Sequence, residues 1–180
     1  HMRGVAYYTA QTARLGGGSV FPRALLWLIS SQRPDGSWGE EHLYYHDRVI
    51  STLASVVALA EINRSKYERR IRAGLDYLWE NSERVREEQH STVGFELIYP
   101  SLLEEALAVG LDVPMFGLSH YTKLRDEKLE PILTELLYSA KTTVTFSAEF
   151  MSNSVNPGRI AQLISSTGCV GNSPSATAYV

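Results

Sequence analysis

The chain has 180 residues, of which 44% are hydrophobic and 21% charged, and its formal net charge is −3 at pH 7. This composition excludes disordered, collagen-like and low-complexity classes, and the mild negative charge gives no sign of a nucleic-acid-binding surface. The length suffices for one domain with a buried core, and no apolar stretch approaches the ~20 residues of a membrane-spanning helix.

Helical periodicity dominates the first half of the chain. Pro22 stands where a first-turn proline belongs, ahead of an apolar run that predicts a short helix. In 46–62 the apolar residues fall on one face of a helix of about four turns. Segment 67–80 repeats this pattern, with Ser65 as its expected N-cap and Glu68 as the capping-box partner.

The second half predicts four further helices. They cover 101–109, with Ser101 as cap, about 124–140, about 158–166, and 173–180. The last of these stops after about two turns, so we expect a chain truncated from a longer protein.

Two segments have the residue types of strands. Both 94–99 and 142–146 are rich in β-branched or aromatic residues, although a helical context favours a helix for the second. The sequence LISS occurs at 28–31 and again at 163–166, before a glycine-containing turn each time. Such repeats suggest stacked helical hairpins, and the fold class predicted is therefore all-α, arranged as an α/α barrel.

The segment 28–39 reads LISSQRPDGSWG. A Gln32 amide at a helix end can bind free carbonyl groups, Gly36 permits a tight turn, and the Trp38 ring can cover the amide. On this basis alone the segment is a structural turn between two helices. It resembles the QW repeat of triterpene and diterpene cyclases, which braces the fold and takes no part in the chemistry.

Five other blocks extend the resemblance to class II diterpene cyclases, the enzymes that make copalyl diphosphate and related bicycles. They read VAYYTA, HDRVISTLA, VGFELIYPSLLE, RDEKL and, at 171–178, GNSPSATA. All occur in the order that the family shows. One departure is Tyr8, where the first helix of the family usually has aspartate.

The resemblance implies two stacked α/α barrels, named β and γ, with γ inserted after the first helix of β. Residues 1–15 then correspond to the leading helix of the β domain, and 20–180 to a γ-domain-like region. The sequence predicts fewer helices than a closed barrel needs. We therefore expect an incomplete barrel that is truncated at its C-terminus, and we expect it to self-associate through its open apolar edge.

The family protonates the terminal alkene of geranylgeranyl diphosphate with the middle aspartate of a DxDD motif, and Mg²⁺ assists. No DxDD occurs in this sequence. Protonating an alkene needs a strongly acidic, desolvated carboxylic acid. We therefore expect the chain to contain no catalytic residue and to be inactive alone.

The resemblance also implies binding residues. Lys128 matches a lysine associated with the diphosphate, and Glu96 matches an acidic position associated with Mg²⁺. Phe146 stands where plant enzymes that make the ent product have a histidine. The ring of Phe146 can stabilise a carbocation but cannot accept a proton, which leaves the product's stereochemistry open. For Asp47 and Arg48 we expect an ion pair at a helix start.

Lys128 is also explained as a solvated surface lysine near Glu127 and Glu130. For the whole chain, two alternatives remain. One is a fragment of a squalene–hopene-type triterpene cyclase, which shares the QW repeat. The other is a non-catalytic helical-hairpin module for protein association. The lone Cys169, the short loops and the lack of a transit-like leader after His1-Met2 predict a cytoplasmic, bacterial protein.

Overall fold

The computed structural model describes residues 22–88, 92, 94–132, 134–139, 141, 144–145, 155–171 and 177. Every element in these ranges is a helix, which confirms the all-α prediction. The elements are α2 (Pro22–Ser30), α3 (Tyr45–Asn81), the 3₁₀ helix η1 (Ser82–Glu87), α4 (Phe95–Ala108), α5 (Leu118–Leu129), α6 (Thr134–Leu137) and α7 (Pro157–Ala161). Segment 1–15, Phe146 and most of the GNSPSATA block lie outside the described residues.

Helix α3 contains the two helices predicted over 46–62 and 67–80, joined at a kink. The kink lies at Asn63, whose backbone is extended, with φ −170° and ψ 91°. The Asn63 side chain accepts a hydrogen bond from the Lys66 amide at 3.0 Å. This is the geometry of an N-cap, so the prediction of Ser65 as the cap is wrong, by two residues.

The first half of α3 is the central helix of the fold. From Tyr45 to Leu59 its residues are buried all round, apart from the half-buried Asp47. The sequence predicted only one buried face. The polar residues among them are accommodated by local bonds; the Ser55 hydroxyl, for example, donates to the Ser51 carbonyl at 2.6 Å.

Helix α4 begins earlier than predicted. Segment 94–99 is not a strand, because the helix starts at Phe95 and runs through Pro100. Ser101 is therefore inside the helix, where its hydroxyl donates to the Leu97 carbonyl at 3.0 Å. A proline lacks its own N–H and crowds the carbonyl one turn before it, a cost that packing of the helix against a core can offset.

The helix predicted over 124–140 is two helices. Helix α5 begins at Leu118 and ends at Leu129, and α6 follows after Pro131. Helix α7 is also shorter than the predicted 158–166.

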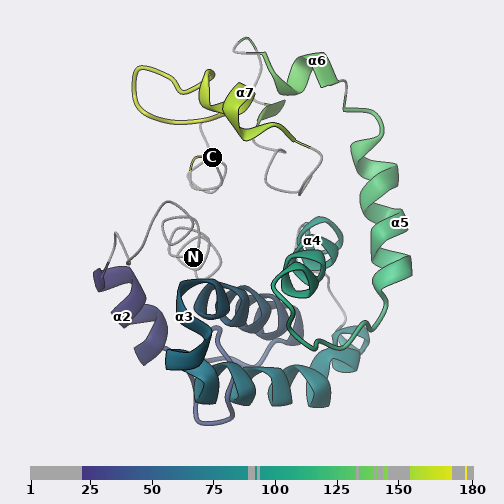
Figure 1. The fold of residues 1–180 in the computed structure, drawn as a ribbon. Coiled ribbons are helices and arrows are strands. Elements are labelled where there is room, and N and C mark those ends of the chain that lie inside the picture. The colour runs from purple at the N-terminus through teal and green to yellow at the C-terminus, as the bar shows by residue number, and fades with distance from the viewer. Residues whose placement is uncertain are drawn as a thin grey trace.

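Two apolar clusters organise the described residues. The large one joins α2, α3, η1 and α4, and the small one consists of Leu137, Val155, Ile160 and Val170. Figure 1 shows α5 rising along one side, from the body formed by α2, α3 and α4 towards α6 and α7. The described helices follow an open arc, as expected of an incomplete α/α barrel. None of them is long and apolar enough to cross a membrane.

Candidate functional site

Trp38 fixes the turn after α2 to the centre of the fold. Its side chain is fully buried, and its indole Nε1 donates a hydrogen bond to the Leu28 carbonyl at 2.7 Å. Its backbone amide donates to the Thr52 hydroxyl at 3.0 Å. The indole thus satisfies a carbonyl of α2 while the ring fills the space against α3.

Gln32 binds the second half of α3. Its Nε2 donates to the carbonyls of Gly36 and Arg70, both at 3.0 Å, and its Oε1 accepts from Arg70 Nη1 at 3.0 Å. Gly36 has φ +86°, and a Cβ built there would lie 2.3 Å from the Ala73 carbonyl oxygen. The turn therefore braces α2 against both halves of α3.

Arg48 is the other anchor of this turn, and its partners differ from the prediction. It forms its ion pair with Asp35, at 3.5 Å, and Asp47 is not its partner. Its guanidinium also donates to the Ser37 hydroxyl at 2.8 Å and to the Glu40 carbonyl at 2.8 Å. The buried guanidinium of Arg48, a planar fork of N–H donors, therefore joins both sides of the loop that precedes α3.

The charge of Asp35 is stabilised despite its partial burial. Burial by itself raises the pKa of this carboxyl, but the hydroxyl and amide of Ser37, with Arg48 and Arg33 nearby, hold its pKa below the ordinary value. Asp47 instead accepts from the Glu40 amide at 2.8 Å and the Ser51 hydroxyl at 3.2 Å. It thus supports the start of α3, as expected, through hydrogen bonds.

His46 connects the HDRVISTLA block to the VGFELIYPSLLE block, called the GFE block below. Its ring stacks on Phe95, with centroids 4.2 Å apart. The Thr92 amide donates to Nδ1 at 3.0 Å, and Nε2 lies 3.0 Å from the Val85 carbonyl. At the same helix start, Glu88 accepts from the Tyr45 amide at 2.7 Å.

Glu96 and Lys128, which the sequence marked separately, form an ion pair between α4 and α5. The Glu96 side chain is only 14% exposed, whereas that of Lys128 is 60% exposed. A solvent-facing ammonium thus meets a largely covered carboxylate. Neighbouring Tyr121 has its pKa raised, first by burial and then by the Glu96 charge.

The donor set at Glu96 fits Mg²⁺ only in company with another ligand. Within the described ranges, no group of three or more His, Cys, Asp or Glu side chains is placed to hold a metal ion. Mg²⁺ typically takes one or two carboxylates and completes its shell with water and substrate phosphates. One carboxylate beside one ammonium therefore matches a magnesium diphosphate better than a free cation.

Arg125 is a site neighbour that the sequence did not single out. Its Nη2 donates to Glu104 Oε1 at 2.8 Å, so it links α5 to α4 close to the Glu96–Lys128 pair. Membership of the RDEKL block and the GFE block was the only signal for these two residues.

Phe146 lies outside the described residues, and its role stays a prediction.

Comparison with known proteins agrees with the resemblance seen in the sequence, although no family model matches the chain. The chain is 34% identical to a chloroplastic bifunctional levopimaradiene synthase of Ginkgo biloba, over 97% of its length and 21% of the relative. It is 34% identical to a chloroplastic copalyl diphosphate synthase of Salvia miltiorrhiza, over 90% of its length and 21% of the relative.

A solved structure gives the same result in three dimensions. The ent-copalyl diphosphate synthase of Arabidopsis thaliana, in complex with (S)-15-aza-14,15-dihydrogeranylgeranyl thiolodiphosphate, matches with a TM-score of 0.81 and 36% identity. The match covers 97% of this chain and 26% of that one.

The chain is therefore homologous, over most of its length, to one segment of the class II diterpene cyclases, copalyl diphosphate synthases among them, and the recognition made from its sequence blocks is confirmed. It spans about a fifth of the length of these curated relatives. The predicted localisation, cytoplasmic and bacterial, is contradicted in its bacterial part, because the relatives are plant enzymes named as chloroplastic.

Proposed function

We propose that this chain is the diphosphate-binding region of a class II diterpene cyclase that converts geranylgeranyl diphosphate into a copalyl-diphosphate-type bicycle. In this proposal residues 20–180 form the γ-domain-like region, and 1–15 the leading helix of the β domain. The proposal rests on the Glu96–Lys128 ion pair, which joins two of the family-like sequence blocks through one anionic and one cationic group.

The two residues have complementary tasks. The Lys128 ammonium, on a flexible and solvent-facing stem, binds diphosphate oxygens, and the Glu96 carboxylate supplies one ligand for Mg²⁺. Bound Mg²⁺ neutralises the diphosphate charge. Because cyclisation by proton addition leaves the diphosphate in place, this region orients the substrate and does not react with it.

The proton donor lies elsewhere in this proposal. The five aspartates of the chain, Asp35, Asp47, Asp76, Asp112 and Asp126, are scattered and form no DxDD. Asp35 is moreover held in its charged form by hydrogen bonds from Ser37. A carboxyl with a lowered pKa is the opposite of the desolvated acid that protonates an alkene. The chain alone is therefore inactive.

Calorimetric titration of inorganic pyrophosphate in the presence of Mg²⁺ tests the binding proposal. We expect Lys128→Met and Glu96→Gln each to weaken binding by about tenfold, the value of one charge-assisted contact. Lys123→Met is the matched control, because Lys123 lies on the same helix but pairs with Glu127 at 3.7 Å, and it keeps the wild-type affinity. Equal affinities in the wild type and Lys128→Met contradict the proposal.

A product assay tests the inactivity of the chain. The chain is incubated with geranylgeranyl diphosphate and Mg²⁺, and the extract is analysed by mass spectrometry. We expect no bicyclic product above a no-protein control. Any such product refutes the assignment of the proton donor to another part of the protein.

A further inference from the structure

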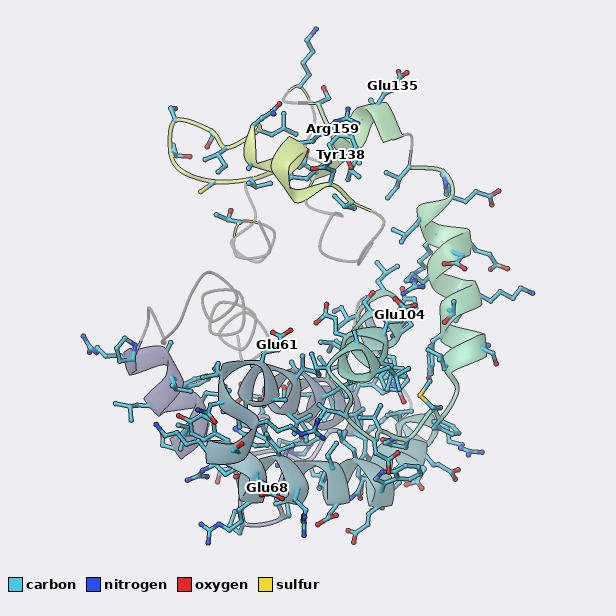
Figure 2. All side chains as sticks on the ribbon, in the orientation of Figure 1. Glu61, Glu68, Glu104, Glu135, Tyr138 and Arg159 are labelled. Atoms are coloured by element: carbon cyan, nitrogen blue, oxygen red, sulfur yellow. The ribbon has the colours of Figure 1, made fainter. Side chains whose placement is uncertain are left out.

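Helix α5 is held to α4 by one line of side chains. None of its residues, all of which the structure describes, is buried. Its contacts with α4 come from Tyr121, Arg125 and Lys128, which are spaced at i, i+4 and i+7 and therefore share one face. Figure 2 shows Glu104, a partner on α4, directed towards the α5 ribbon. At the start of α5, Leu118 and Tyr121 pack against the large apolar cluster, whereas the second half of the helix meets α4 through the polar contacts of Arg125 and Lys128.

Tyr121 fixes only the first half of α5. Its ring meets Phe95 and Tyr99 edge to face, at centroid distances of 5.1 and 5.4 Å. Lys128 comes seven residues later, about 10 Å further along the helix axis at 1.5 Å per residue. A small rotation about the Tyr121 contact therefore moves the Lys128 stem away from Glu96.

Arg125 fixes α5 one turn before Lys128. Its side chain is 12% exposed, and its two terminal nitrogens reach different residues of α4. Nη2 donates to Glu104 at 2.8 Å, and Nη1 lies 3.4 Å from the Ser101 hydroxyl. A planar guanidinium bound at two points constrains both the rotation and the sliding of the helix that carries it.

We propose that Arg125 is a positioning residue of the diphosphate site: it holds α5 against α4 so that Lys128 stands opposite Glu96. This inference rests on the proposed function for its ligand, but its structural part does not. Arg125 itself is engaged with Glu104 and Ser101, so it acts on the ligand only through Lys128.

The test is a double-mutant cycle read by the affinity for inorganic pyrophosphate with Mg²⁺. We expect Arg125→Gln to weaken binding about fivefold in the wild-type background and to have no further effect in the Lys128→Met background. Arg125→Lys, which keeps the charge but loses the fork, restores part of the loss. An equal loss in both backgrounds, or no loss in either, overturns the proposal.

A second readout needs no ligand and separates this inference from the proposed function. The NMR signals of the Lys128 side chain, ¹³Cε and ¹⁵Nζ, report whether the ammonium meets a carboxylate. We expect Arg125→Gln to shift them to the positions that they take in Glu96→Gln, with the melting temperature held within a few degrees by the aromatic contacts. Unshifted signals overturn the positioning role even if pyrophosphate binds, and shifted signals support it even if pyrophosphate does not bind.

Discussion

The imidazole of His46 stacks on the ring of Phe95, with the two planes at 21°, and is held between two backbone groups of opposite kind. The Thr92 amide donates to Nδ1, and the Val85 carbonyl lies against Nε2. Because a carbonyl only accepts, Nε2 carries a hydrogen, and because Nδ1 accepts the Thr92 N–H it carries none, so the ring is neutral. A second proton on Nδ1 would face the Thr92 N–H. The start of α3 and the GFE block therefore pack together through an uncharged histidine.

This arrangement predicts a loss of stability on acidification. Burial lowers the pKa of His46 below 6.5, although the Val85 carbonyl and the Glu88 charge oppose the shift. Below pH 6.5 the unfolded chain therefore binds a proton at His46 that the folded chain does not. The contribution of the neutral ring to stability is fully present above pH 6.5 and decreases as the pH falls from 6.5 to the lowered folded-state pKa. Urea denaturation at pH 7.5 and 5.5 measures the fall.

The variant His46→Gln isolates this contribution. It is less stable than the wild type at pH 7.5, but it loses less stability between pH 7.5 and 5.5, because no imidazole titrates there. His42, which is exposed, provides the control His42→Gln, whose pH dependence stays that of the wild type. If His46→Gln and the wild type lose equal stability on acidification, the neutral, buried ring is the wrong assignment.

Trp38→Phe tests the indole bond in the turn. The substitution removes the donor to the Leu28 carbonyl and leaves a cavity at a fully buried position, so we expect the free energy of unfolding to fall by about 2–4 kcal/mol. In the control Trp79→Phe, the indole bond to the Asp112 carbonyl lies at a side chain that is 55% exposed. That variant loses less than about 1 kcal/mol. Similar losses for the two tryptophans would argue against a bracing role for Trp38.

Gly36→Ala tests the close approach of the same turn to α3. The positive φ of Gly36 strains any other residue, and the new Cβ meets the Ala73 carbonyl oxygen, so we expect a cost of about 3 kcal/mol or more. Gly110 has a similar φ of +72°, but the nearest atom to its Cβ is 3.6 Å away on a flexible arginine. Gly110→Ala thus isolates the backbone cost of about 1 kcal/mol. Thermal denaturation of the pair should separate the two, and equal shifts in melting temperature would rule out the clash.

Arg48→Lys tests the buried fork. Lysine keeps the charge but cannot reach Ser37 and the Glu40 carbonyl at once, and we expect a loss of about 2–4 kcal/mol in the free energy of unfolding. Arg72→Lys, at an exposed pair with Glu68, changes stability by less than about 0.5 kcal/mol. A loss for Arg48→Lys as small as that of Arg72→Lys would mean that charge alone matters at this position.

Helices with strong apolar periodicity were predictable, whereas their ends depend on single residues whose role the local sequence does not determine. Ser65 and Glu68 have the sequence of a capping box, yet Asn63 caps the helix because the chain kinks two residues earlier. Pro100 has the sequence context of a helix boundary, but α4 already has a full turn ahead of it, and its packing against the core offsets the cost of the proline. These are choices between local alternatives that tertiary packing decides.

The sequence indicates candidate site residues, but it does not indicate how they are connected. Glu96 and Lys128 came from the resemblance, while their pairing depends on how α4 crosses α5, which no local pattern encodes. Arg48 illustrates the same limit. Its sequence neighbour Asp47 was the obvious partner, but the loop returns Asp35 and the Glu40 carbonyl to the guanidinium instead.

The most direct test of the proposed diphosphate binding observes the phosphorus nuclei of the proposed substrate. In ³¹P NMR, geranylgeranyl diphosphate with Mg²⁺ is titrated with the wild-type chain, with Lys128→Met, and with Lys123→Met as the control from the same helix. We expect both diphosphate resonances to shift and broaden with the wild type and the control, and to remain close to their free positions with Lys128→Met. Identical shifts with Lys128→Met and the wild type would contradict the assignment of this chain as the diphosphate-binding region of a diterpene cyclase.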